Sequence, residues 1–159
     1  MYLLGLGLLV FFSVEAEPQK PFWKAKEKVY ERVQNREIIL TVKSEDLAGQ
    51  QRLVVVGGGQ VEAPQDFVFQ SLQDYERLSR LSDFVRDSKF DAATKILTFK
   101  VSAFGYGSSM ATRFEAVPSQ TKPIIKFVVV EGPVTGFQGT FSLDKISQTK
   151  TEIAMDAEY

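Results

Sequence analysis

The feature that most constrains the fold is a period-two alternation of residue types through the second half of the chain. The alternation recurs in successive runs that are separated by turn-forming residues such as Gly132-Pro133. The residues that share a face within each run are Leu97, Phe99, Val101 and Ala103; Met110, Thr112, Phe114 and Ala116; Ile125, Phe127 and Val129; Phe137, Gly139, Phe141 and Leu143; and Ile153, Met155, Ala157 and Tyr159. Because successive side chains of a strand point to opposite faces, the pattern predicts an antiparallel sheet with one dry and one wet face.

Two short helices precede this sheet. The first is expected to begin at Pro64, because the missing N–H of proline costs nothing at a first helical position. Asp74 is a candidate cap for the second. Phe67, Val68 and Leu72 have helical spacing in the first helix, and Tyr75, Leu78 and Leu81 are expected to form the buried stripe of the second. The predicted order is therefore a strand, two short helices and about six further strands, which is an α+β fold.

The segment before the helices is predicted to hold a β-hairpin. Residues 37–43 alternate, which places Ile38, Leu40 and Val42 on one face. Residues 44–51 are assigned to a turn and residues 52–62 to the second strand. The glycines at 57–59 lack the spacing of a nucleotide-binding loop and indicate a bulge or bend. Further upstream, residues 22–33 form a short helix or an extended lead-in, anchored by Trp23, Val29 and Tyr30.

Composition excludes several kinds of chemistry. The chain of 159 residues has no Cys and no His. A Ser-His-Asp or Cys-His nucleophile, a Cys/His zinc site and a disulfide framework are therefore ruled out. We expect no metal and no cofactor. Glu115 and Glu131 alternate with apolar residues and are assigned to the wet face. The formal net charge of −1 gives no reason to expect nucleic acid as a partner.

The first sixteen residues are interpreted as a signal peptide. The chain is uncharged from Leu3 to Val14, which is shorter than the ~20 residues of a spanning helix. Val14-Glu15-Ala16 has the small-x-small form of a cleavage site. We therefore expect an exported protein, periplasmic or secreted; a buried segment or an uncleaved anchor are the alternatives. Residues 17–52 form a basic lead-in with an extra strand, for which peripheral membrane contact is an open role, and residues 53–159 form the main domain.

Several motifs carry a family resemblance. The stretch GGGQVEAPQDFVFQSLQDYERLSRLSDFV, from Gly57 to Val85, contains an Ala63-Pro64 helix start and a 74–78 segment DYERL. Downstream lie Glu131-Gly132-Pro133, the 136–143 segment GFQGTFSL and the 150–153 segment KTEI. In this order the motifs resemble the START-like, or SRPBCC, superfamily, and more closely its polyketide cyclase/dehydrase and coenzyme-Q-binding branch. The resemblance spans about residues 53–159.

The resemblance implies a helix-grip fold, in which a curved antiparallel sheet grips a long C-terminal helix and encloses an apolar cavity. This sequence stops at Tyr159, inside its last predicted strand. Either it is a fragment, which is the favoured interpretation, or another element replaces that helix. Without a cover, the apolar face of the sheet would be exposed.

The aromatic and methionine residues of the dry face are the candidate ligand contacts. Core packing is the alternative role for the same residues. The candidates are Tyr75, Phe99, Tyr106, Met110, Phe114, Phe127, Phe137, Phe141, Met155 and Tyr159.

The favoured hypothesis is an exported, non-enzymatic binder or carrier of a lipid, quinone or other hydrophobic molecule. One alternative is a cyclase- or dehydratase-like enzyme on the same fold, which an inward-facing Arg113 would favour. The other is a protein-interaction module that uses the basic lead-in and the hairpin.

Overall fold

The computed structural model describes residues 21–47, 49–77, 80, 84–103 and 106–159. The elements in chain order are η1 (Phe22–Ala25), α1 (Glu27–Gln34), β1 (Ile39–Leu47), β2 (Gln50–Val61), α2 (Gln65–Ser71), η2 (Tyr75–Arg77), β3 (Val85–Asp91), β4 (Ile96–Ala103), β5 (Tyr106–Val117), β6 (Ile124–Glu131), β7 (Gln138–Ser147) and β8 (Lys150–Glu158). Six strands follow the two short helices, as the sequence predicts.

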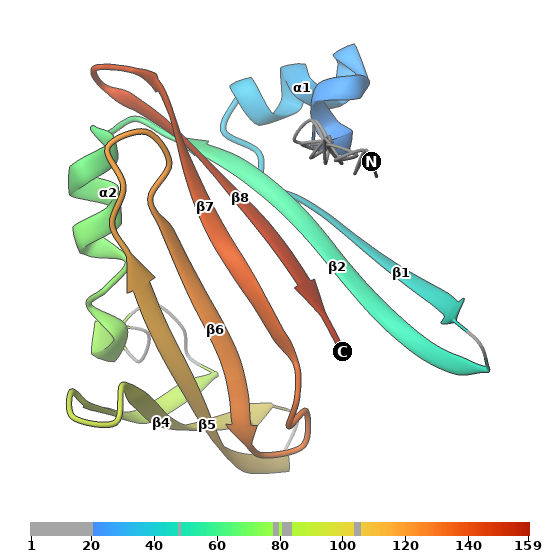
Figure 1. The fold of residues 1–159 in the computed structure, drawn as a ribbon, viewed down its shortest axis with the longest axis vertical. Coiled ribbons are helices and arrows are strands. Elements are labelled where there is room, and N and C mark those ends of the chain that lie inside the picture. Colours follow the sequence, from blue (N-terminus) through green and yellow to red (C-terminus); the bar gives the residue numbers. More distant parts are fainter. Residues whose placement is uncertain (1–20, 48, 78–79, 81–83, 104–105) are drawn as a thin grey trace, which may run out of the picture.

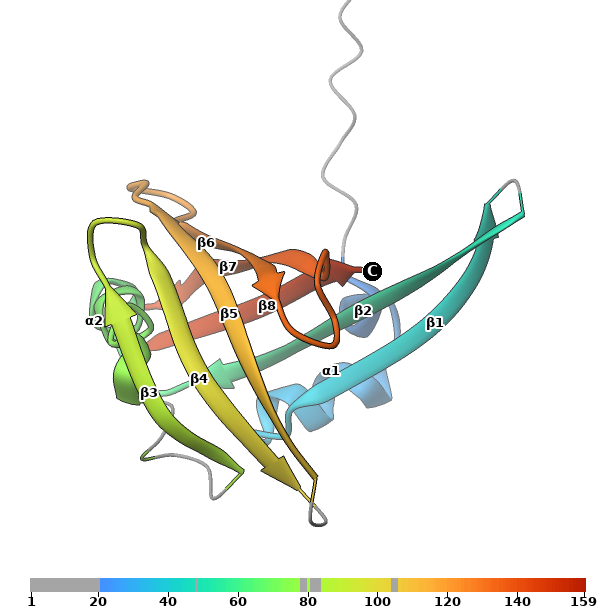
Figure 2. The same ribbon diagram turned by 90° about the horizontal axis from the view of Figure 1, so that it is seen from below.

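The strands of the described chain form one antiparallel sheet of eight strands, in the order β1-β2-β8-β7-β6-β5-β4-β3. After β2 the chain passes through α2 and η2 to the far edge at β3, and then returns strand by strand until β8 pairs with β2. The sheet is strongly curved, and the β1–β2 hairpin projects away from the other strands (Figures 1 and 2).

The strand register defines two faces of this sheet. Leu40 pairs with Gly57, Gly57 with Met155, Met155 with Phe141 and Phe141 with Ile125, so these side chains form one row. We call the face that carries this row the inner face. The helix α2 packs against β7 and β8, and η2 packs against β3. The alternation read from the sequence is therefore confirmed as a division between two faces.

The opposite face, which we call the back face, carries the lead-in. Trp23 in η1 is 2% exposed and packs in a cluster with Val33 and Ile39. The indole lies against Gly58, where an added Cβ would come within 2.5 Å of the ring atom Cζ2. The predicted alternative of a bulge at this glycine is wrong, because β2 pairs without interruption across it with both β1 and β8. Glycine is needed here because the indole approaches the backbone closely.

Other local expectations are corrected by the structure. The hairpin turn is shorter than residues 44–51, because β1 continues to Leu47 and β2 begins at Gln50. Gly49 closes this turn with a φ of +82° and donates its N–H to Asp46 Oδ1. Pro64 precedes α2 as its N-cap rather than as its first residue. Within the described part of the chain the Asp74 side chain does not cap η2; the Asp74 backbone carbonyl accepts the N–H of Arg77 instead. Leu78 and Leu81 lie outside the described residues.

The inner face is uncovered at the hairpin. Ile38, Leu40 and Val42 share one face as predicted, and they are 83%, 57% and 55% exposed. In the described chain no long helix follows β8, so the helix that the resemblance implies does not cover them. No helix among the described residues is long and apolar enough to cross a membrane, and the apolar segment at residues 3–14 lies outside them.

Candidate functional site

An apolar cavity of about 420 Å³ lies between the inner face of the sheet and the helical segment formed by α2 and η2. Its volume falls within the range of small-molecule sites, which is about 300–1,000 Å³. The residues that line it are Val61, Ala63, Phe67, Val68, Ser71, Leu72, Asp74, Tyr75, Arg77, Phe114, Ile125, Phe141 and Ile153. Apolar side chains thus dominate the lining, and the few polar groups come from α2, η2 and the link between them.

Two buried polar side chains fix the start of α2 over the cavity. The amide of Gln65, the first residue of α2, donates to the carbonyls of Leu143 at 2.8 Å and Thr121 at 3.2 Å. The hydroxyl of Thr151 in β8 donates to the carbonyl of Ala63 at 2.8 Å. A helix of two turns has little intrinsic stability, so these bonds and the packing of Val68 must hold it.

The η2 end of the helical segment is fixed to β3. The carboxylate of Glu76 accepts the backbone N–H of Phe90 at 2.9 Å. The hydroxyl of Ser88 donates to the Glu76 carbonyl at 2.8 Å. Because Tyr75 precedes Glu76 in η2, these two hydrogen bonds also hold Tyr75 against the sheet.

Tyr75 is stacked within the aromatic wall of the cavity. Its ring lies 4.3 Å from that of Phe114 at an interplanar angle of 17°, and 4.8 Å from that of Phe90. Burial raises the pKa of the Tyr75 hydroxyl. The phenol is therefore neutral at physiological pH and can donate a hydrogen bond.

The sequence-predicted residues fall into two groups along the inner face. Tyr75, Phe114 and Phe141 line the cavity, and Phe99 packs against the same core cluster. Phe127 continues the aromatic row beyond the cavity, with its ring 5.4 Å from that of Phe141.

The remaining candidates lie further from the cavity. Phe137 packs against Phe127 at 5.6 Å, Met155 pairs with Phe141, and Met110 pairs with Phe99. Tyr159 is exposed beyond the end of β8. The side chain of Tyr106 lies outside the described part of the structure.

Comparison with known proteins identifies the family. A family model described as "Polyketide cyclase / dehydrase and lipid transport" matches residues 61–159. The chain belongs to this family. The match covers the cavity-lining helices and strands β3 to β8, whereas the β1 strand and the lead-in lie outside it. Among curated proteins, none matches the sequence.

Solved structures of the superfamily share the fold of this polyketide cyclase family member. A START superfamily protein from Mycobacterium smegmatis is 15% identical with a TM-score of 0.54, over 66% of this chain and 74% of that one. The Zhui aromatase/cyclase from Streptomyces sp. R1128 is 14% identical with a TM-score of 0.56, over 67% of each chain. A STAR-related lipid transfer protein from Xanthomonas axonopodis is 12% identical with a TM-score of 0.56, over 74% of this chain and 80% of that one. The predicted START-like fold is confirmed.

Sequence reasoning left out part of the cavity lining of this family member. Ile125 and Ile153 lie on the alternating inner face, and Val68 and Leu72 have the spacing of one helix face. Their spacing signals burial, but spacing alone does not distinguish a core contact from a cavity wall. Phe67 lines the cavity although it is also largely exposed.

The positions of three charged residues bear on whether this family member has the groups of an enzyme. Arg113 is exposed and lies between Thr112 and Phe114, which face inward, so it belongs to the back face. Glu115 and Glu131 are exposed, as predicted. The guanidinium of Arg113 therefore does not reach the cavity and cannot act on a molecule bound there.

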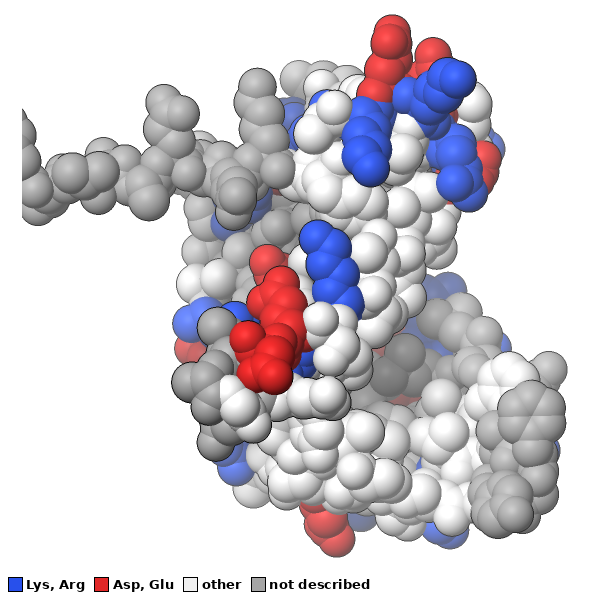
Figure 3. Space-filling view, turned by 90° about the vertical axis from the view of Figure 1, so that its right-hand side faces the viewer, with Lys and Arg blue, Asp and Glu red and all other residues white. Residues whose placement is uncertain are grey.

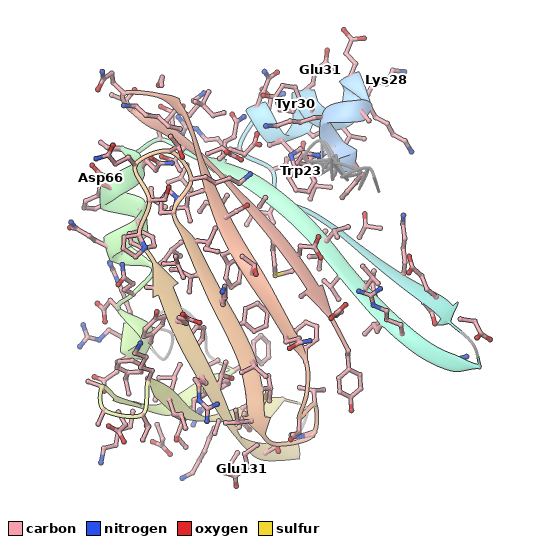
Figure 4. All side chains as sticks on the ribbon, viewed as in Figure 1. Trp23, Lys28, Tyr30, Glu31, Asp66 and Glu131 are labelled. Carbon is pink, nitrogen blue, oxygen red and sulfur yellow. The ribbon has the colours of Figure 1, made fainter. Side chains whose placement is uncertain are left out.

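Glu152 is the charged residue that sequence reasoning placed wrongly. It alternates with the inner-face residues of its run, a pattern that predicts a solvent-exposed side chain, but the side chain is 0% exposed. The Lys24 ammonium lies 2.6 Å from Glu152 Oε1, and the Gln60 amide donates to Oε2 at 3.2 Å. The lead-in covers this part of the back face. In Figure 4, Trp23 lies on the side of the lead-in that faces the sheet, whereas Lys28 and Glu31 point away from the sheet.

Proposed function

We propose that the chain is a non-enzymatic binder or carrier that holds a hydrophobic small molecule in the inner cavity. The observation that carries this proposal is the cavity itself, which lies between α2, η2 and the inner face and is lined mainly by aliphatic and aromatic side chains. A site of this kind recognises a ligand mainly by removing apolar surface from water, and a few polar groups orient the ligand. Lipids and quinones belong to this ligand class.

A cyclase- or dehydratase-like enzyme is the second candidate. The observation in its favour is that Tyr75, Asp74 and Arg77 contribute to the cavity lining. General acid–base catalysis works best with a group whose pKa lies near the working pH. Asp74 and Arg77 are exposed, and burial moves the pKa of Tyr75 further above neutrality. These properties support binding over catalysis.

We further propose that the protein is exported, on the evidence of the apolar segment and cleavage-site pattern in residues 1–16. The mass of the mature protein secreted by an expressing cell tests this directly. A mature N-terminus near Glu17 supports export, and retention of residues 1–16 contradicts cleavage.

The binding proposal is tested by native mass spectrometry of the purified full chain, followed by extraction and identification of any bound molecule. We expect a complex with a hydrophobic molecule that is recovered chemically unchanged. Leu72→Trp fills the cavity from its lining, and Leu53→Trp is the matched control on β2 outside the cavity; the two leucines are 36% and 38% exposed.

The ligand should be lost in L72W and retained in L53W. Equal retention in both variants would place the ligand elsewhere on the protein. A chemically altered ligand after incubation would favour the enzyme. Circular dichroism confirms that both variants are folded.

A further inference from the structure

The polar groups that line the cavity indicate which kind of ligand can bind there. Tyr75 is 9% exposed, and both neighbouring rings, Phe114 and Phe90, hold its phenol ring in place. Among the described residues its hydroxyl forms no hydrogen bond. The hydroxyl oxygen is not among the buried side-chain atoms that lack a partner, so it keeps accessible surface and this lining residue offers an unused donor.

The charges of the lining balance each other. Asp74 and Arg77 contribute one charge of each sign, and both are exposed. The other lining residues that the structure describes carry no charge. A fatty acid or a phosphate ester needs a cation that compensates its charge inside the cavity, since burying an unpaired anion is very unfavourable. The lining therefore fits an uncharged ligand.

The shape of the wall favours a ring. Tyr75, Phe114, Phe141 and Phe67 present aromatic surface to one cavity of about 420 Å³. Aromatic walls bind flat rings through offset-stacked and edge-to-face contacts. The only other hydroxyl of the described lining, that of Ser71, lies at the last residue of α2, where a serine can bond the carbonyl one turn back.

We infer that the ligand is an uncharged, ring-containing molecule with a hydrogen-bond acceptor, such as a ketone or an ether oxygen, and that the Tyr75 hydroxyl donates to this acceptor. The inference rests on the proposed function, because it concerns the same cavity. It assigns to Tyr75 the selection of oxygen-bearing rings over plain hydrocarbons. The raised pKa keeps the phenol protonated, so its donor is available at physiological pH.

Calorimetric titration of the full chain with three probes of similar size tests this assignment. The probes are 2-acetonaphthone, a neutral ketone; naphthalene, a hydrocarbon; and 2-naphthoate, an anion. We expect the ketone to bind about three- to tenfold more tightly than naphthalene, which is the effect of one net hydrogen bond. Naphthoate should bind most weakly.

Tyr75→Phe isolates the hydroxyl, because it keeps the ring stacked on Phe114. In Y75F the ketone should bind only as tightly as naphthalene, and naphthalene binding should not change. Tyr30→Phe is the matched control, because Tyr30 packs beside Trp23 on the back face. It should behave like the wild type.

Each alternative outcome has a separate meaning. Equal binding of ketone and naphthalene, or a ketone preference that persists in Y75F, overturns the role of Tyr75 and leaves the proposed function standing. Tightest binding of naphthoate overturns the assignment of an uncharged ligand. Absence of binding by all three probes contradicts the proposed function itself.

Discussion

Replacing Lys24 with methionine tests whether the lead-in is fastened to the back face by a buried ion pair. The substitution keeps a long apolar side chain but removes the ammonium 2.6 Å from Glu152 Oε1. The Glu152 side chain is 0% exposed and would retain only the bond from Gln60 at 3.2 Å. Leaving a buried charge without its partner costs about 3–5 kcal/mol. Because the Lys24 side chain is 28% exposed, water screens part of the interaction, and we expect a loss of about 2–3 kcal/mol.

Urea unfolding near neutral pH measures this loss through the fluorescence of Trp23, the one tryptophan of the chain. Lys100→Met is the matched control, because the Lys100–Asp87 pair at 2.9 Å is exposed on both sides. Such surface pairs contribute about 0–1 kcal/mol. The reasoning is refuted if K24M and K100M unfold at the same urea concentration.

The same ion pair predicts a dependence on pH. Burial alone would lower the pKa of Lys24, but its hydrogen bond to Glu152 and the charge of that carboxylate outweigh burial and raise the pKa above 10.5. A raised pKa in the folded state adds stability that is fully present below the unfolded value and is lost as pH rises through the folded value. The stability difference between wild type and K24M should therefore shrink above about pH 10.5. A constant difference up to the alkaline limit of folding would contradict this.

Three further predictions test the packing. Gly58→Val should destabilise the protein by about 2 kcal/mol or more, because its side chain meets the indole, whereas Gly107→Ala, in more open space, should change the unfolding midpoint little. Leu97→Ala, at a fully buried position, should cost about 2–5 kcal/mol in the same assay, and Leu40→Ala, at an exposed one, less than about 1 kcal/mol. In an ultraviolet titration of the tyrosines, Tyr75→Phe should remove the part of the absorbance change that occurs above the usual tyrosine pKa, because burial raises the pKa of Tyr75. If the variant instead loses absorbance change at the usual tyrosine pKa, burial does not control the ionisation of this hydroxyl.

The inner face of the sheet is predictable because burial there has a local signature. Phe114, Ile125 and Phe141 stand at every second position of their strands, and this period alone assigns them to one face. The order of helices and strands follows from the same patterns and from the turn residues between them. Whether a given inner residue faces a cavity or the core depends on where α2 and η2 come to lie, which no local pattern encodes.

The back face shows what local patterns miss. Glu152 alternates as a solvent-exposed residue would, and Gly58 looks like an irregularity of the strand. Both are explained by Trp23 and Lys24, which come from a distant part of the sequence and pack on β2 and β8.

The hairpin is mispredicted in a different way. Its polar positions at 44–46 look like a turn but belong to β1, because both faces of the projecting arm meet solvent (Figure 1).

Seen from the β1 side, charges of both signs gather over the lead-in at the top of Figure 3. This agrees with a solvated outer surface of α1 rather than a uniformly basic one.

The central claim is that ligand binds in the cavity between α2, η2 and the sheet, and not on the open apolar surface of the hairpin. Intermolecular NOEs between bound 2-acetonaphthone and the isotope-labelled full chain distinguish the two places directly. We predict contacts from the naphthalene protons to the side chains of Phe114, Ile125 and Phe141, which line the cavity. Contacts confined to Leu40 and Val42, on the open surface, would contradict the account.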